Sequence, residues 1–179
     1  MTRQRTRFPA ELIAGLAAVL LLLLAGPHSL SAQGDRDPST PVDVRIGVAV
    51  IEYLETRYGT RASQPDGVAI SGLASLEPSG ERVAFAPADA SHVARLTDRP
   101  LLTGRWMCGA NPSVQLTWTV VIEERSDGEA VVEAVQAAST DQRHGSVFHR
   151  LRLERHDSAW GVAEVLSTFS THGDCRAPG

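Results

Sequence analysis

The chain has 179 residues, a formal net charge of −4, and 42% hydrophobic and 21% charged residues. This composition excludes collagen-like, disordered and multi-span membrane proteins. All 17 basic residues are arginines, so chemistry that needs a Schiff-base, P-loop or kinase-type lysine is excluded. The acidic balance also argues against binding to nucleic acid or to anionic lipid.

The first 32 residues have the three parts of a secretory signal peptide. Three arginines precede an apolar stretch of 14 residues, Leu12 to Ala25, and Leu30-Ser31-Ala32 offers a small-residue cleavage site. A membrane-spanning helix needs about 20 apolar residues, more than this stretch contains. We therefore expect export to the periplasm or the extracellular space, with no membrane attachment after cleavage. An uncleaved N-terminal membrane anchor is the alternative.

Cleavage at this point would leave 147 residues with a net charge of −6, enough for one domain with its own core. Residues 33–39 are polar, with Gly34 and Pro38, and predict a flexible mature N-terminus. Residues 40–179 are expected to form a single α+β domain.

A helix is predicted over residues 41–58. Thr40 suits the N-cap, Pro41 the first helical position and Asp43 the positive end of the helix dipole. Gly59 follows the last turn, where a left-handed cap is expected. Apolar residues recur at helical spacing between these ends: Val42, Ile46, Ala49, Val50, Tyr53 and Leu54.

The stretch from 59 to 112 predicts shorter elements. Val68–Ile70 and Val83–Phe85 are candidate strands, with a turn signal at Pro78–Gly80 between them. Residues 88–97 predict a short helix opened by Pro87.

Strands dominate from Ser113 onward. Apolar and polar residues alternate from Val114 to Ile122, as in a half-buried strand. Two hairpins follow, and we expect their four strands to form an antiparallel meander. The first hairpin turns at 126–128, with Gly128 in a left-handed conformation, and its return strand covers 129–138. A polar loop follows at 139–145. The second hairpin then pairs 146–155 with 160–169.

These patterns predict an α+β fold with one N-terminal helix packed on a curved antiparallel sheet of four to six strands. This order of elements resembles the nuclear-transport-factor-2-like and cystatin-like folds, in which a helix lies in a curved sheet. The resemblance covers architecture only, and the Gln-x-Val-x-Gly loop of cystatin-type inhibitors is absent. Such folds host enzymes and binding modules alike, so the resemblance implies no particular activity.

The two cysteines, Cys108 and Cys175, both lie in the exported part. In an oxidising compartment such a pair is most simply a disulfide, and two buried free thiols are the alternative. The bond would tie the C-terminal tail to the start of the sheet.

His149 and Glu164 are the candidate catalytic residues. With a turn at Asp157-Ser158, Leu153 faces Val162, Leu151 faces Glu164, and His149 faces Leu166. His149 and Glu164 would then be diagonal neighbours on one apolar face, where they could act as a general acid/base pair. The alternative is a structural histidine and a solvated glutamate, because a slip of one residue moves both to the other face.

Other groups predict no cofactor or metal site. Four histidines lie in the last 36 residues, but their spacing matches no metal-ligand pattern. Arg150 and Arg152 alternate on the polar face of their strand, either as an anion site or as partners of cross-strand carboxylates. Trp106, Trp118 and Trp160 are interpreted as core anchors rather than a ligand-binding box.

We therefore expect an exported, non-catalytic domain that binds a small ligand or a protein partner in the concavity of the sheet. The alternative is a small cofactor-free enzyme of the nuclear-transport-factor-2-like type that uses His149 and Glu164. A concavity lined by polar groups would favour the enzyme, and one filled by Trp118, Val120 and the helix would favour a binding domain or a scaffold.

Overall fold

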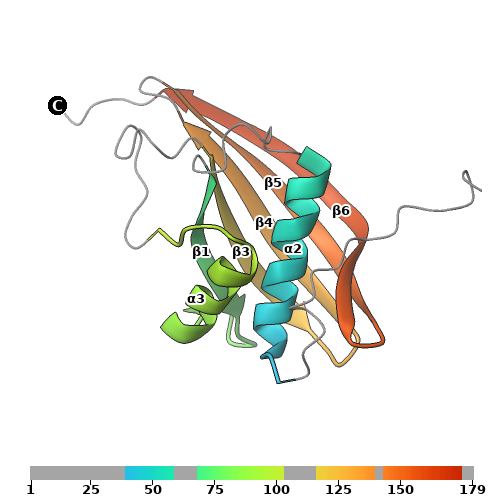
Figure 1. Cartoon of the computed structure of the whole chain (residues 1–179). Coiled ribbons are helices and arrows are strands. Elements are labelled where there is room, and N and C mark those ends of the chain that lie inside the picture. The colour runs from blue at the N-terminus through green and yellow to red at the C-terminus, as the bar shows by residue number, and fades with distance from the viewer. Residues whose placement is uncertain (1–38, 59–67, 103–115, 140–142, 175–179) are drawn as a thin grey trace, which may run out of the picture. The chain divides into compact units, whose positions relative to one another are not determined.

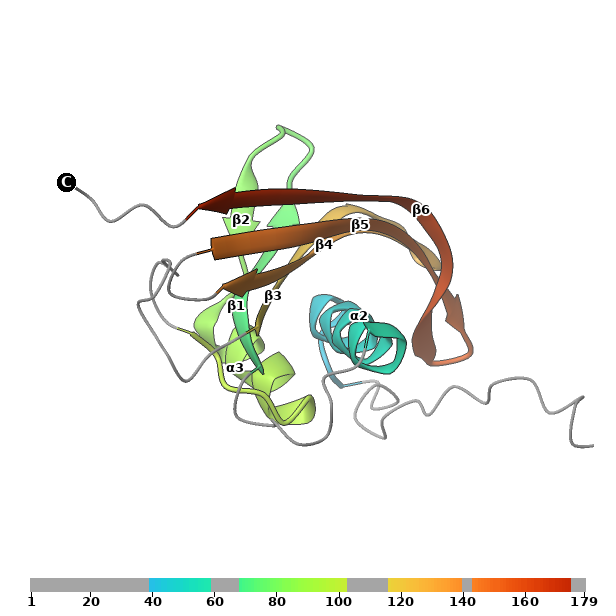
Figure 2. The same ribbon diagram turned by 90° about the horizontal axis from the view of Figure 1, so that it is seen from above.

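A six-stranded sheet curves around one long helix (Figures 1 and 2). This computed structural model describes residues 39–58, 68–102, 116–139 and 143–174. The elements in chain order are α2 Val42–Tyr58, β1 Val68–Leu76, β2 Arg82–Ala84, α3 Pro87–Leu96, β3 Leu116–Arg125, β4 Glu129–Ser139, β5 Arg143–His156 and β6 Ala159–Asp174. The signal-like segment, Gly59, Trp106 and both cysteines lie outside the described residues.

The strand order is β2-β1-β3-β4-β5-β6. The meander predicted for the last four strands is confirmed, since β3 to β6 pair antiparallel in sequence order. The sheet is nevertheless mixed rather than purely antiparallel, because β1 pairs with β3 in parallel. The chain crosses from one to the other through β2 and α3, a connection long enough for a parallel pair.

Helix α2 lies on the concave side of the sheet, as Figure 2 shows. Its predicted bounds are confirmed to within a residue, and Asp43 lies in its first turn. The core between helix and sheet contains Ile46, Val50 and Leu54 from α2, with Trp118 and Val120 from β3. All five are fully buried. Burial of such side chains contributes roughly 1.5–3 kcal/mol each to stability.

The structure tests the predictions made for the short helix and for the turns. Helix α3 begins at Pro87, and the turn after β1 has Gly80 in the left-handed region at φ 81°. The prediction for Gly128 is wrong, since its φ is not positive. In the last hairpin it is Asp157 that takes the left-handed conformation, at φ 57°, which aspartate tolerates better than most residues.

The last hairpin is longer than predicted. Strand β5 begins at Arg143, inside the expected polar loop, and β6 continues to Asp174. Strand pairing therefore extends beyond the apolar pattern, with Gly145 opposite His172 and His144 opposite Gly173. A glycine opposite each imidazole leaves room for the ring, since a Cβ on Gly173 would lie 2.5 Å from the ring of His144.

No helix among the described residues is long and apolar enough to span a membrane.

Candidate functional site

His149 is the one histidine of the described chain that is fully buried. It lies in the middle of β5 on the concave face, where Leu151 and Leu153 follow it at the alternate positions. Its neighbours in the sheet are Ala134 on β4 and Thr168 on β6. The predicted position of His149 on the apolar face is therefore confirmed.

Two hydroxyl groups contact the same nitrogen of His149. The Tyr58 hydroxyl lies 3.3 Å from Nδ1, and the Thr168 hydroxyl lies 3.2 Å from it. The phenol ring of Tyr58 also stacks on the imidazole, with ring centres 4.5 Å apart and planes inclined by 29°. Tyr53, five residues earlier in α2, packs edge-on against Tyr58, with ring centres 6.4 Å apart. The end of α2 thus supplies an aromatic cover for the histidine.

The other nitrogen of His149, Nε2, is buried and has no hydrogen-bond partner within the described part of the chain. Burial lowers the pKa of His149, so the ring is neutral at physiological pH. If a hydroxyl donates its hydrogen to Nδ1, the ring proton is on Nε2. If Nδ1 instead donates its proton to a hydroxyl oxygen, Nε2 carries a lone pair. In either tautomer Nε2 can form one further hydrogen bond. A buried polar atom without a partner costs about 1–3 kcal/mol, which makes this atom the strongest sign of a missing contact.

The indole nitrogen of Trp118 is a second buried polar atom without a hydrogen-bond partner among the described residues. Trp118 projects from β3 to the same concave face as His149, because Val120 on β3 is in register with Ala134 on β4, which is in register with His149. The concave face therefore combines an apolar core with two polar atoms that the described protein leaves unsatisfied.

Glu164 does not accompany His149, so the predicted acid/base pair is wrong. Glu164 is opposite Arg152, and its carboxylate accepts hydrogen bonds from Arg152 Nη2 at 3.1 Å and Nε at 3.2 Å. Its side chain is 54% exposed. Since the side chains of Arg152 and His149 point to opposite faces of β5, the two candidate residues are separated by the sheet.

Two β-bulges explain the error. Leu153 faces Val162 as predicted, but the register then shifts twice, and His149 faces Thr168 instead of Leu166. Ala163 is the extra residue in the first shift, and Leu166 in the second. Each extra residue reverses the faces of those that follow it, so Glu164, between the bulges, points away from the helix.

The arginines of the convex face are engaged by carboxylates. Arg150 donates to Glu123 at 2.7 Å, and Arg152 pairs with Glu154 as well as Glu164. These contacts raise the pKa of both guanidinium groups, chiefly through hydrogen bonds from Arg150 to Glu123 and from Arg152 to Glu154. Of the two interpretations of the arginine row, the structure supports cross-strand ion pairs.

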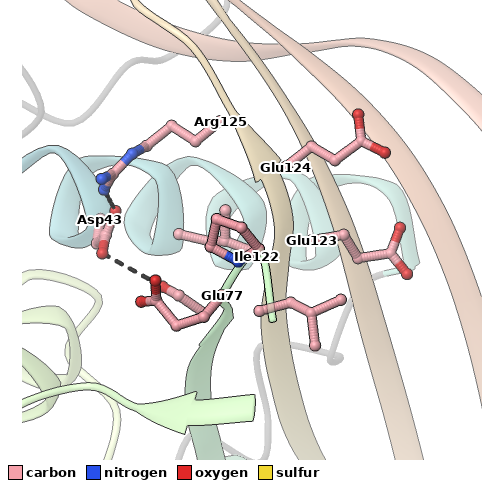
Figure 3. A pocket seen from close by; sticks show the side chains of 9 residues that line it. Asp43, Glu77, Ile122, Glu123, Glu124 and Arg125 are labelled. Carbon is pink, nitrogen blue, oxygen red and sulfur yellow. Dashed lines mark hydrogen bonds and ion pairs between the residues drawn. The ribbon is translucent and has the colours of Figure 1, made fainter. Parts of the chain in front are cut away.

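A pocket of about 460 Å³ opens between the start of α2 and the ends of β1 and β3 (Figure 3). The carboxylate of Asp43 in this pocket already has protein partners, because it pairs with Arg125 and accepts a hydrogen bond from Ser75 at 3.3 Å. Figure 3 shows Glu123 and Glu124 pointing away from this pair. None of the described residues that line the pocket has a buried polar atom without a hydrogen-bond partner, in contrast to His149.

The remaining predictions on candidate residues concern metals and tryptophans. Among the described residues no three histidines, cysteines or carboxylates lie close enough together to hold a metal ion. Trp118 and Trp160 are buried core residues, as predicted. Cys108 and Cys175 lie outside the described residues, so their predicted bond stays a prediction.

Sequence reasoning found His149 but missed Tyr58 and Thr168. Tyr58 lies four residues after Leu54, so helical periodicity places it on the apolar face of α2. Its position toward the sheet could therefore have been predicted. Thr168 had no such signal, because its contact with His149 depends on both bulges.

Comparison with protein-family models, with curated proteins and with solved structures found no match. The geometry of the concave face is therefore the basis for a functional proposal.

Proposed function

We propose that this protein is an exported, non-catalytic domain that binds a small ligand on the concave face of its sheet. The observation that carries the proposal is the buried Nε2 atom of His149, for which the described residues offer no hydrogen-bond partner. A curved sheet around a helix supports a nuclear-transport-factor-2-like or cystatin-like architecture, and export rests on residues 1–32.

The surroundings of His149 define the chemistry of the ligand. A neutral imidazole offers one hydrogen bond and no charge, and the nearby walls are apolar and aromatic. A small aromatic molecule with one hydroxyl, amide or ring nitrogen would complete the hydrogen bond to Nε2. Such a pattern, an apolar site with few polar groups, is typical of small-molecule binding sites.

Access to Nε2 requires a movement, since the atom is sealed from solvent. Tyr58 is the last residue of α2, is 37% exposed and covers the imidazole. Helix ends open more easily than helix centres. We infer that the Tyr58 ring swings away and that the ligand takes its place on His149.

The position of Glu164 supports binding rather than catalysis. The alternative enzyme would use His149 and Glu164 together as a general acid/base pair. Glu164 is on the opposite face, where Arg152 holds it. The filling of the concavity by Trp118, Val120 and α2 is the outcome expected of a binding domain or a scaffold rather than of the enzyme.

The test uses nitrogen NMR of the histidine side chains during titration with phenol, indole and benzamide as probes. We expect at least one probe to shift the Nε2 signal of His149. His149→Phe keeps an aromatic ring but removes the nitrogen, and should abolish binding. His172→Phe, at an exposed histidine on β6, is the matched control and should bind as the wild type does.

Equal binding by the wild type and His149→Phe would show that His149 does not recognise the ligand. A His149 signal that none of the probes shifts would leave the residue with a structural role only and would overturn the proposal.

A further inference from the structure

The two edges of the sheet differ in their protection against strand pairing. The β2 edge is three residues long, and its Arg82 pairs with Glu133. The β6 edge is 16 residues long, and no described strand pairs with its outer side. Between Val165 and Gly173 it contains no Asp, Glu, Lys, Arg or Pro. Natural edge strands are usually shortened or guarded by such residues, so this edge has the character of an interface.

Exposed apolar side chains mark the same part of β6. Phe169 is 55% exposed, and Val165 and Leu166 are each 41% exposed. On the convex face Phe169 stacks on Phe148 of β5, with ring centres 4.5 Å apart and planes within 3° of parallel. Phe148 belongs to β5, and Phe169 belongs to β6, the strand at the open edge.

The sequence around Phe169 is self-complementary for antiparallel pairing. The segment 167–171 reads Ser-Thr-Phe-Ser-Thr. About a two-fold axis at Phe169, Phe169 faces its own copy, Thr168 faces Ser170, and Ser167 faces Thr171. Aromatic pairs and hydroxyl pairs are both favourable across antiparallel strands.

We propose that two copies of this chain associate through β6, in antiparallel register about a two-fold axis at Phe169. The edge is straight there, since residues 167–174 pair with β5 without a bulge. The bulge at Leu166 ends the straight segment before Glu164, so no like charges meet inside it. The two sheets become one, and a row of four phenylalanines, Phe148 and Phe169 from each copy, crosses the junction.

The short paired segment predicts weak, reversible association, because interfaces below about 1,200 Å² are typical of transient complexes. Sedimentation velocity of the purified protein should show a monomer–dimer equilibrium as concentration rises. Phe169→Lys places two like charges opposite each other and should weaken association by about tenfold or more. Val83→Lys, a 43% exposed residue of the β2 edge, is the matched control and should leave it unchanged.

A cysteine at the two-fold axis tests the register. In Phe169→Cys the two introduced thiols face each other, and mild oxidation should give a covalent dimer. In Ser167→Cys the introduced thiols are four residues apart along the paired strands and should not cross-link. Cys108 and Cys175 are present in both variants and in the wild type, so their background is shared.

Three outcomes would overturn the proposal. The first is a protein that stays monomeric at all concentrations, and the second is association that Phe169→Lys does not weaken while circular dichroism shows it folded. The third is cross-linking of Ser167→Cys as efficient as that of Phe169→Cys. Should Phe169→Lys fail to fold, the pair of cysteine variants still decides the register and the interface.

Discussion

Arg45, in the first turn of α2, donates a hydrogen bond of 3.1 Å from Nη1 to the main-chain oxygen of Ser158. Ser158 lies in the turn between β5 and β6, 113 residues further along the chain. The Arg45 side chain is buried, and its Nε has no hydrogen-bond partner among the described residues. One guanidinium group thus connects the start of the helix to the far end of the last hairpin.

Arg45→Ala should therefore lower the free energy of unfolding by about 1–3 kcal/mol, because the Ser158 carbonyl loses its partner and the arginine stem no longer packs. Arg45→Met restores the apolar stem without the donor and should recover part of this loss. Urea denaturation measures both variants. Arg95→Ala, at an exposed arginine of α3, is the control and should stay within about 0.5 kcal/mol of the wild type. Equal effects of Arg45→Ala and Arg95→Ala would contradict the buried contact.

Glu164→Gln tests the convex-face position of this carboxylate. The ion pair with Arg152 is exposed, and exposed pairs contribute about 0–1 kcal/mol. We expect the substitution to change the free energy of unfolding by no more than about 0.5 kcal/mol, measured by urea denaturation. A loss well above about 1 kcal/mol would instead indicate a buried partner for Glu164.

The helix and the hairpins were predictable because their signals are local. The periodicity of α2 and the alternation through Leu151 and Leu153 each assign a buried face from a few neighbouring residues. The same alternation placed His149 correctly. A bulge breaks the alternation of faces along a strand, because one extra residue in β6 reverses the predicted face of every residue beyond it.

The contacts of His149 could not be predicted, since they join distant segments. Tyr58 comes from a helix 91 residues earlier in the sequence, and Thr168 from a strand whose register is set by two bulges. The parallel pairing of β1 with β3 was also missed. The direction of this pairing depends on how the connection through β2 and α3 packs against the sheet. No short sequence pattern in β1 or β3 specifies the course of that connection.

The predicted disulfide between Cys108 and Cys175 concerns residues outside the described part of the chain. The two cysteines are separated by 66 residues. Closing a loop of this size stabilises a folded protein by about 4 kcal/mol in the chain-entropy model. Alkylation of the exported protein, unfolded but not reduced, should add no label, and reduction should expose two thiols. Two labelled thiols without reduction would exclude the bond.

Export itself is open to a direct measurement. If residues 1–32 are a cleaved signal peptide, mass spectrometry of the secreted or periplasmic protein should show a chain that begins near Gln33. Recovery of only the full-length chain, from membranes, would favour the uncleaved anchor instead.

The buried imidazole of His149 makes stability depend on pH. Burial lowers its pKa in the folded protein below the value of about 6.5 expected for the unfolded chain. Well above pH 6.5 the ring is neutral in both states and does not affect the pH dependence. As the pH falls below 6.5, the unfolded chain binds a proton that the folded protein does not bind. The free energy of unfolding should therefore fall with decreasing pH, by at most about 1.4 kcal/mol per pH unit, until the folded pKa is reached.

His149→Gln isolates this effect, since glutamine keeps a polar side chain near Tyr58 and Thr168 but does not titrate. Urea denaturation of both proteins between pH 7.5 and pH 5 gives the difference in their free energies of unfolding at each pH. We expect this difference to be constant well above pH 6.5 and to shift in favour of the variant as the pH falls through and below it, because only the wild type has a buried ring that resists protonation. His172→Gln, at an exposed histidine, should follow the wild-type curve throughout. A difference between the wild type and His149→Gln that stays constant down to pH 5 would mean that His149 binds a proton equally well in the folded and the unfolded protein. That result would contradict the burial of the ring.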